Sequence, residues 1–153
     1  NYWSRISGPF LDRIDLFVDV APVTATDLTL PPPSEGTAEA AARVAVARER
    51  QMKRYEELSG NRRPVNADAP SSDVDTICAL DENARALVAK AAEQLSLSAR
   101  AYHRILKVAR TIADLDGAGS VARVHVAEAL NYRFRPAVSP VSNRSGAVSG
   151  LIA

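Results

Sequence analysis

The chain has 153 residues, 46% of them hydrophobic and 24% charged, a length that suits one domain with a core of its own. The formal net charge is only +1, so any contact with nucleic acid or phosphate must come from local clusters rather than from bulk charge. The single cysteine, Cys78, excludes an intramolecular disulfide framework and a cysteine-cluster zinc site. No apolar run is long enough to span a membrane and no signal-peptide pattern opens the chain, so we expect a cytoplasmic protein with no membrane partner.

The first 36 residues contain a strand-like pattern and a proline-rich linker. From Ile14 to Val20 apolar and acidic residues alternate, which is typical of a half-buried strand. The segment Leu30–Gly36 holds three consecutive prolines, which favour an extended path. A strand needs neighbours to be stable, and the sequence starts at Asn1 without a methionine. We therefore expect the partner strands to precede Asn1 in a longer protein, and residues 1–36 to be loosely attached here.

Residues 37–135 are predicted to form a mainly α bundle of four to five helices. Thr37 is the expected cap of an alanine-rich first helix with many basic residues, and Asp81 is the expected cap of the third. Beyond Arg135, serine, proline and glycine recur without periodicity, so residues 136–153 are predicted to be a disordered tail. The predicted helices span about 38–58, 74–80, 82–95, most of 97–117 and 122–132.

The stretch Leu97–Gly117 gives the clearest helical signal. Ser98 can cap its start, and Gly117 suits the left-handed conformation that often ends a helix. The apolar residues recur at three and four positions and define an inward face, made of Ala101, Ile105, Val108, Ala109, Ile112 and Leu115. The opposite face is basic, with Arg100, His103, Arg104, Lys107 and Arg110. This face is either an ordinary solvated surface or an anion-binding one, and in the second case Arg104, Lys107 and Arg110 are the candidates for nucleic-acid or phosphate contacts.

No complete active site is visible in these residues. Nothing matches the glycine-rich phosphate-binding loop, and no Ser, His and Asp grouping suggests nucleophilic catalysis. His103 and His125 stand alone without the spacing of metal ligands, so we expect them to be structural and we predict no metal-binding residues. Cys78 is expected to be a small apolar residue near a helix.

Four blocks of the sequence carry a resemblance to a known family. They are RISGPFLDRIDLFVDV at 5–20, RVAVARERQMKRY at 43–55, LSLSARAYHRILKVARTIADLDG at 95–117 and VHVAEALNYR at 124–133. In this order they resemble the magnesium-chelatase-like AAA+ ATPases, and among them the family of the competence protein ComM. The resemblance implies that residues 1–36 are the end of an α/β ATPase core with its last strand and a linker, and that residues 37–135 are its helical lid.

The same resemblance implies roles for two arginines. Arg13 matches the arginine finger, which reaches the γ-phosphate of ATP bound by a neighbouring subunit and is worth about three to five orders of magnitude in rate in GTPases. Its alternative is a surface arginine or a salt bridge to Asp12 or Asp15. Arg100 matches the sensor-2 arginine, which contacts bound nucleotide and couples hydrolysis to lid movement. Its alternative is simply membership of the basic face.

The implied parent protein binds ATP and Mg²⁺, assembles into a homo-oligomeric ring and uses hydrolysis to move a substrate. In the ComM branch that substrate is branched DNA, processed by helicase or branch-migration activity. One alternative is the motor subunit of a magnesium chelatase, although this chain has Asp12-Arg13-Ile14-Asp15 where those subunits have a D-R-F-type turn. The other is a non-catalytic interaction module. Salt-dependent DNA binding separates the first two functions, and nucleotide binding separates both from the third.

The chain on its own is predicted to bind neither ATP nor Mg²⁺ and to show no ATP hydrolysis, because it lacks the phosphate-binding loop and the metal-binding acid of such enzymes. A steady-state phosphate-release assay on the purified chain measures this. Turnover above that of a buffer control would contradict the prediction.

Overall fold

The computed structural model of the chain describes residues 10, 13–20, 22–25, 27–31, 35–59 and 65–133. These residues form five α-helices, so the predicted mainly α bundle is confirmed. The predicted tail, residues 136–153, and part of the predicted core end lie outside the described residues. The elements are η2 (Asp27–Thr29), α2 (Thr37–Ser59), η3 (Asn66–Asp68), α3 (Val74–Cys78), α4 (Glu82–Gln94), α5 (Ala99–Asp116) and α6 (Arg123–Arg133), where η marks a short 3-10 helix.

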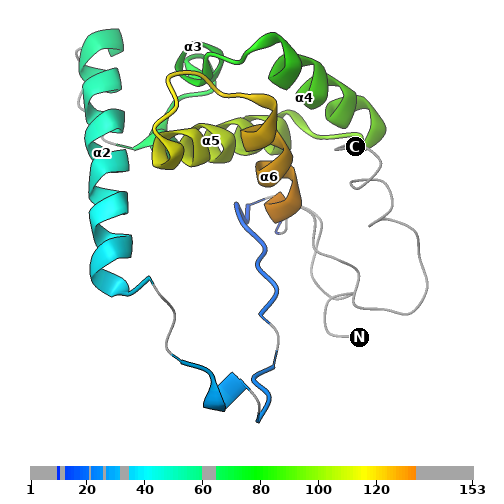
Figure 1. Cartoon of the computed structure of the whole chain (residues 1–153). Coiled ribbons are helices and arrows are strands. Elements are labelled where there is room, and N and C mark those ends of the chain that lie inside the picture. Colours follow the sequence, from blue (N-terminus) through cyan, green and yellow to red (C-terminus); the bar gives the residue numbers. More distant parts are fainter. Residues whose placement is uncertain are drawn as a thin grey trace.

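Helix α5 is the central element of the bundle (Figure 1). Helices α2, α3 and α6 and the turn η3 pack against it, while α4 packs on α6. The Ser98 hydroxyl oxygen accepts a hydrogen bond from the backbone N–H of Ala101 at 3.2 Å, and Gly117 ends the helix at φ 76°, so both predicted ends of α5 are confirmed. The predicted inward position of Leu115 is wrong, because Leu115 is 41% exposed and Leu106 and Ala113 face the core instead.

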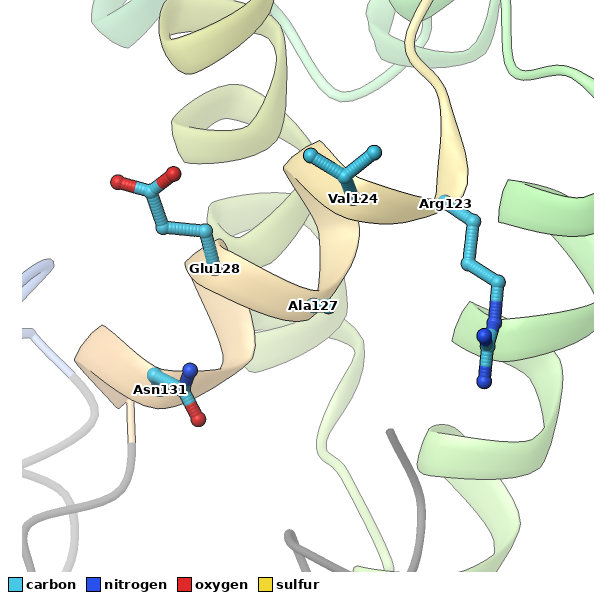
Figure 2. A pocket seen from close by; sticks show the side chains of 5 residues that line it. All are labelled: Arg123, Val124, Ala127, Glu128 and Asn131. Carbon is cyan, nitrogen blue, oxygen red and sulfur yellow. The ribbon is translucent and has the colours of Figure 1, made fainter. Parts of the chain in front are cut away.

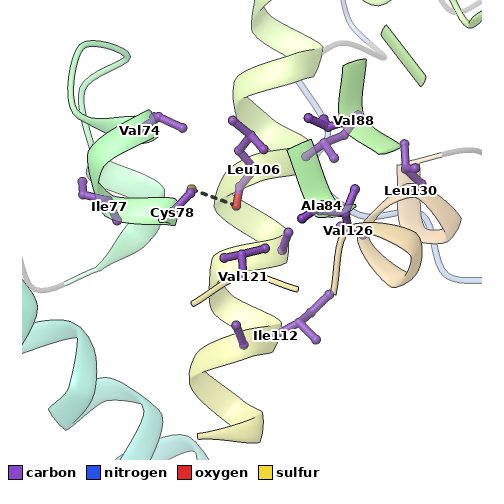
Figure 3. Close-up of a cluster of buried hydrophobic side chains, with 14 of the residues drawn as sticks. Val74, Ile77, Cys78, Ala84, Val88, Leu106, Ile112, Val121, Val126 and Leu130 are labelled. Atoms are coloured by element: carbon purple, nitrogen blue, oxygen red, sulfur yellow. Dashed lines mark hydrogen bonds between the residues drawn. The ribbon is translucent and has the colours of Figure 1, made fainter. Parts of the chain in front are cut away.

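The hydrophobic core lies between α5 and the helices α3, α4 and α6 (Figure 3). A parallel bridge between Leu80 and Val121 holds the start of α4 beside the start of α6. Within it, the backbone N–H of Asp81 donates to the Val121 carbonyl oxygen at 3.1 Å. The Asp81 carboxylate also caps α4 as predicted, accepting from the N–H of Ala84 at 2.6 Å. Burial of this apolar surface supplies the main driving force for folding.

The strand predicted at Ile14–Val20 is not confirmed. The described part of the chain contains no strand, and residues 14–20 adopt no regular secondary structure. The segment instead lies against the end of α6, where the N–H of Phe17 donates to the Tyr132 carbonyl oxygen at 2.7 Å. Its apolar side chains stay largely exposed, with Val18 at 66%. The physical reason is that a single extended segment cannot form a sheet unless another strand lies beside it.

Helix α2 is attached to the bundle through its C-terminal half. Ala47, Gln51 and Tyr55 are buried there, whereas residues 37–46 are exposed apart from the half-buried Ala40. Figure 1 shows the N-terminal end of α2 extending away from the other helices. Thr37, predicted as the cap, is the first helical residue, and Glu39 accepts from the N–H of Gly36 at 3.0 Å. In the described part of the chain, no helix is both long and apolar enough to cross a membrane.

Cys78 is predicted to resist alkylation in the folded chain. The thiol is 1% exposed and donates to the Leu106 carbonyl oxygen at 3.4 Å (dashed in Figure 3), and burial raises its pKa from 9.0 to about 12. At pH 8 we expect iodoacetamide to react at least about a hundredfold more slowly than with the urea-unfolded chain.

The same pKa shift predicts a loss of stability in alkali. The pKa of Cys78 in the folded chain lies above its value in the unfolded chain. The contribution of the buried thiol to the free energy of unfolding is therefore fully present below pH 9.0 and is lost as the pH rises toward about 12.

In the alkylation experiment, equal rates in the folded and unfolded chains would contradict the burial of Cys78.

Candidate functional site

A buried charged cluster joins α2 to α5. Asp114 of α5 is 0% exposed. Its carboxylate accepts hydrogen bonds from Arg54 of α2 and from Arg110, one turn earlier on α5. The side-chain amide of Asn66, in η3, donates a further bond to it at 2.9 Å. Two guanidinium groups from different helices therefore share one buried carboxylate.

The remaining donors and acceptors around the cluster are also used. Arg110 donates to the carbonyl oxygens of Ala118 at 2.6 Å and Gly119 at 3.0 Å, which fixes the loop after α5. Burial lowers the pKa of Arg110, and the Asp114 carboxylate opposes that shift. Arg50 of α2 donates to the Asp114 carbonyl oxygen at 2.6 Å. Among the described residues, no buried side-chain nitrogen or oxygen lacks a partner, so the buried polar atoms of this cluster are all hydrogen-bonded within the chain.

Gly117 meets two requirements beside this cluster. Its φ of 76° is a conformation that side chains disfavour. A Cβ atom at this position would also come within 3.0 Å of the Arg50 guanidinium. Glycine thus ends α5 and leaves room for the arginine that docks α2.

Arg110 does not lie on the exposed basic face where we predicted it. The side chain is 1% exposed and donates to Asp114 and to the loop after α5, so the predicted placement is wrong. The sequence held a signal for this, because the neighbouring positions on the same helix face are the apolar Leu106 and Ala113. Asp114, four residues on, is the matching anion for an intrahelical ion pair.

Arg104 and Lys107, the other two candidates for nucleic-acid or phosphate contacts, also have partners within the chain. Arg104 forms an ion pair with Asp15 at 2.5 Å and donates to the carbonyl oxygen of Arg13. The Lys107 ammonium group donates to the Ala67 carbonyl oxygen at 2.9 Å. The basic face of α5 is therefore used largely to bind other parts of the same chain.

The two arginines with predicted nucleotide roles are both exposed. Arg13 is a turn residue, and its backbone N–H donates to the Phe10 carbonyl oxygen at 2.9 Å. Arg100 lies in the first turn of α5. Since Arg104 contacts the backbone of Arg13, one turn along the helix from Arg100, the fold brings both residues to the same end of α5. In the described residues Asp15 pairs with Arg104 and forms no ion pair with Arg13.

The two histidines differ in their surroundings. His103 stacks edge-on against Tyr102 with ring centroids 5.7 Å apart. His125 is buried, and its Nδ1 accepts from the N–H of Ala122 at 2.9 Å while its Nε2 lies 3.3 Å from the Asp116 carboxylate. In the described ranges no group of three or more His, Cys, Asp or Glu side chains could hold a metal ion.

A shallow cavity of about 410 Å³ lies on the outer face of α6 (Figure 2). All its lining residues come from this one helix, and none is a predicted site residue. Val124, one of these lining residues, is apolar and 61% exposed. Ligand pockets usually enclose most of the ligand surface, and a single helix face does not. The lining residues are Arg123, Val124, Ala127, Glu128 and Asn131.

The helical bundle and the segment before it match known sequences in one consistent order. The chain belongs to the family described as magnesium chelatase, subunit ChlI C-terminal, whose model matches residues 34–133. A second model, described as magnesium chelatase, subunit ChlI, matches residues 1–28. The family predicted from the four sequence blocks is therefore confirmed.

Individual relatives agree with this assignment. The competence protein ComM of Haemophilus influenzae is 41% identical over 133 residues, which cover 87% of this chain and 25% of that protein. The uncharacterized YifB proteins of Escherichia coli and Salmonella typhimurium are 38% and 36% identical over 142 residues. The chain spans about a quarter of the length of the curated relatives it matches.

Replacing Asp114 by asparagine is predicted to destabilise the bundle strongly. The Asp114→Asn variant keeps the shape of the side chain but leaves Arg54 and Arg110 without their shared anion, and breaking a buried pair in this way costs about 3–5 kcal/mol. Urea unfolding followed by circular dichroism gives the change in the free energy of unfolding.

The matched control is Asp116→Asn, on the same helix but with a side chain that is 57% exposed. It should cost less than about 1 kcal/mol. Equal losses in the two variants would show that the buried cluster does not hold α2 against α5.

Proposed function

We propose that this chain is the C-terminal lid, with the end of the core, of a ring-forming AAA+ ATPase of the ComM type. The observation that carries the proposal is the ordered match of the two chelatase models to residues 1–28 and 34–133, with the helical bundle formed by the second region. In this proposal the longer protein supplies the phosphate-binding loop and the Mg²⁺ ligands, and the ring is built from identical subunits.

The exposure of Arg13 and Arg100 supports their proposed roles. A finger must project from its own subunit to reach ATP held by the next one, and the Arg13 side chain is exposed. Arg100 is also exposed and lies in the first turn of α5, where the helix dipole adds to the attraction of the guanidinium for phosphate. We assign Arg13 to stabilising charge in the transition state and Arg100 to binding the nucleotide of its own subunit.

The internal partners of the other cations support a lid that moves as one body. Arg54 and Arg110 hold α2 to α5 through Asp114, and Lys107 holds η3. A rigid lid can pass a change at Arg100 to the whole bundle, because packed elements shift together rather than deform. We propose that this movement couples ATP hydrolysis to work on the substrate.

DNA is the substrate we propose, and a metal chelatase is the second candidate. The first is supported by the similarity to a competence protein, and the second by the description of the family itself. DNA-stimulated ATPase activity of the longer protein, weakening as salt rises, is expected for the first function. Stimulation by a tetrapyrrole and its Mg²⁺-loading partner, with no effect of DNA, would favour the second.

The role of Arg13 is tested by mixing two inactive variants of the longer protein. Arg13→Ala should still bind ATP and should lose about a thousandfold or more in turnover, and a variant lacking the lysine of the phosphate-binding loop should also be inactive. Mixed rings contain some interfaces with the lysine on one side and Arg13 on the other. We therefore expect mixing to restore part of the ATPase activity.

The experiment has two controls. A subunit that carries both substitutions should restore nothing when it is mixed with either variant. Arg85→Ala, an exposed arginine of α4, should leave turnover unchanged. No recovery in mixtures that are shown to co-assemble would rule out a finger role for Arg13.

A further inference from the structure

Two arginines of the lid hold the backbone that follows the predicted finger. Arg104 of α5 donates to the carbonyl oxygen of Arg13, and Arg133 at the end of α6 donates to that of Ile14 at 3.0 Å. Arg104 also pairs with the Asp15 carboxylate at 2.5 Å. The N–H of Phe17 then donates to the Tyr132 carbonyl oxygen at 2.7 Å. Contacts to α5 and α6 thus follow one another along residues 13–17.

These contacts decide where the segment lies. Residues 14–20 have no secondary structure of their own, and most of their side chains are exposed, so apolar burial contributes little to their position. Hydrogen bonds from a charged donor are about twice as strong as neutral ones. The Arg104 side chain is only 23% exposed, which reduces its competition with water. The arginine contacts are therefore the main forces that attach this segment to the lid.

We propose that Arg104 and Arg133 are positioning residues that bind the backbone of residues 13–17 to α5 and α6, so that Arg13 moves with the lid. The inference rests on the proposed finger role of Arg13. Arg100 lies one turn before Arg104 on the same helix. A lid that shifts when Arg100 meets nucleotide would then also shift the finger that the subunit presents to its neighbour, and would link successive sites around a ring.

Amide hydrogen exchange of this chain, followed by NMR, tests the attachment directly. In the unmodified chain we expect the Phe17 amide to exchange at least about tenfold more slowly than an unstructured amide, because it is hydrogen-bonded. The double variant Arg104→Ala, Arg133→Ala should lose that protection. Arg104→Lys, alone, should retain part of it, because an ammonium group can still donate to the Arg13 carbonyl oxygen.

The matched control is Arg43→Ala. It also removes an ion-paired arginine, since Arg43 contacts Glu35 at 3.0 Å, but it should leave Phe17 protected. An unchanged alkylation rate of Cys78 shows that the bundle of each variant is still folded. Unchanged protection of Phe17 in a folded double variant, or no protection in the unmodified chain, would overturn the attachment.

Kinetics of the longer protein test the positioning role. Arg104→Ala should lower kcat about tenfold with little change in the KM for ATP, because a misplaced finger affects the transition state rather than the bound substrate. Adding Arg104→Ala to Arg13→Ala should cause no further loss, since both act through one group. Arg104→Lys should keep part of the kcat.

The two proposals fail in different ways. If Arg13→Ala leaves kcat unchanged, the finger role fails, while the exchange experiment still decides whether Arg104 and Arg133 hold the segment. If Arg13→Ala abolishes turnover and the folded Arg104→Ala variant keeps its full kcat, the positioning role is overturned.

Discussion

Two arginines share the carboxylate of Asp114, and this contact sets how the long helix α2 meets the rest of the bundle. A buried carboxylate is tolerated only when its charge is paired and its oxygens are hydrogen-bonded. Arg110, on the same helix, forms one ion pair with Asp114, and Arg54 of α2 forms the other. Because Arg50 bonds the Asp114 carbonyl oxygen at the same time, α2 is fixed both along and around its own axis. Asn66 adds η3 to the same centre.

The arginines of this chain fall into groups with different physical roles. Arg54 and Arg110 are structural, and their loss would unfold the joint between α2 and α5. Arg104 and Arg133 bind backbone carbonyl groups of a segment that forms no strand in the described part of the chain. Arg13 and Arg100 keep their side chains exposed and carry the proposed nucleotide chemistry. Sequence spacing alone does not separate these groups, because Arg100, Arg104 and Arg110 lie on the same helix, α5, and belong to three different groups.

Local signals in the sequence predicted most of the fold. The caps at Ser98 and Asp81, and the glycine and the helical periodicity of α5, act within a few residues, so they are visible in a single sequence. The family resemblance predicted the candidate sites Arg13 and Arg100. The burial of Arg110 was missed, because a charged residue counts as polar in any periodicity even when an acid one turn away neutralises it.

The other features that the sequence did not predict depend on residues that are far apart along the chain. Arg54 and Asp114 are separated by 60 residues, and Asn66 comes from a stretch that is a plain loop by composition. Nothing local marks these residues as partners. The pattern at Ile14–Val20 does have the alternation of a strand, but alternation reports only a preference, and strand formation needs an edge to pair with.

The partly free helix α2 has a mechanical consequence. The bundle holds it between Ala47 and Tyr55, and from Ala47 to Thr37 the helix rises by about 15 Å at 1.5 Å per residue. A tilt of about 10° at the joint would therefore sweep the N-terminal end of α2 through about 3 Å. The helix would thus pivot at the Asp114 cluster, and its N-terminal end would move farthest. A small rotation of α5 becomes a larger displacement at Gly36, where the chain leads back toward residues 1–28.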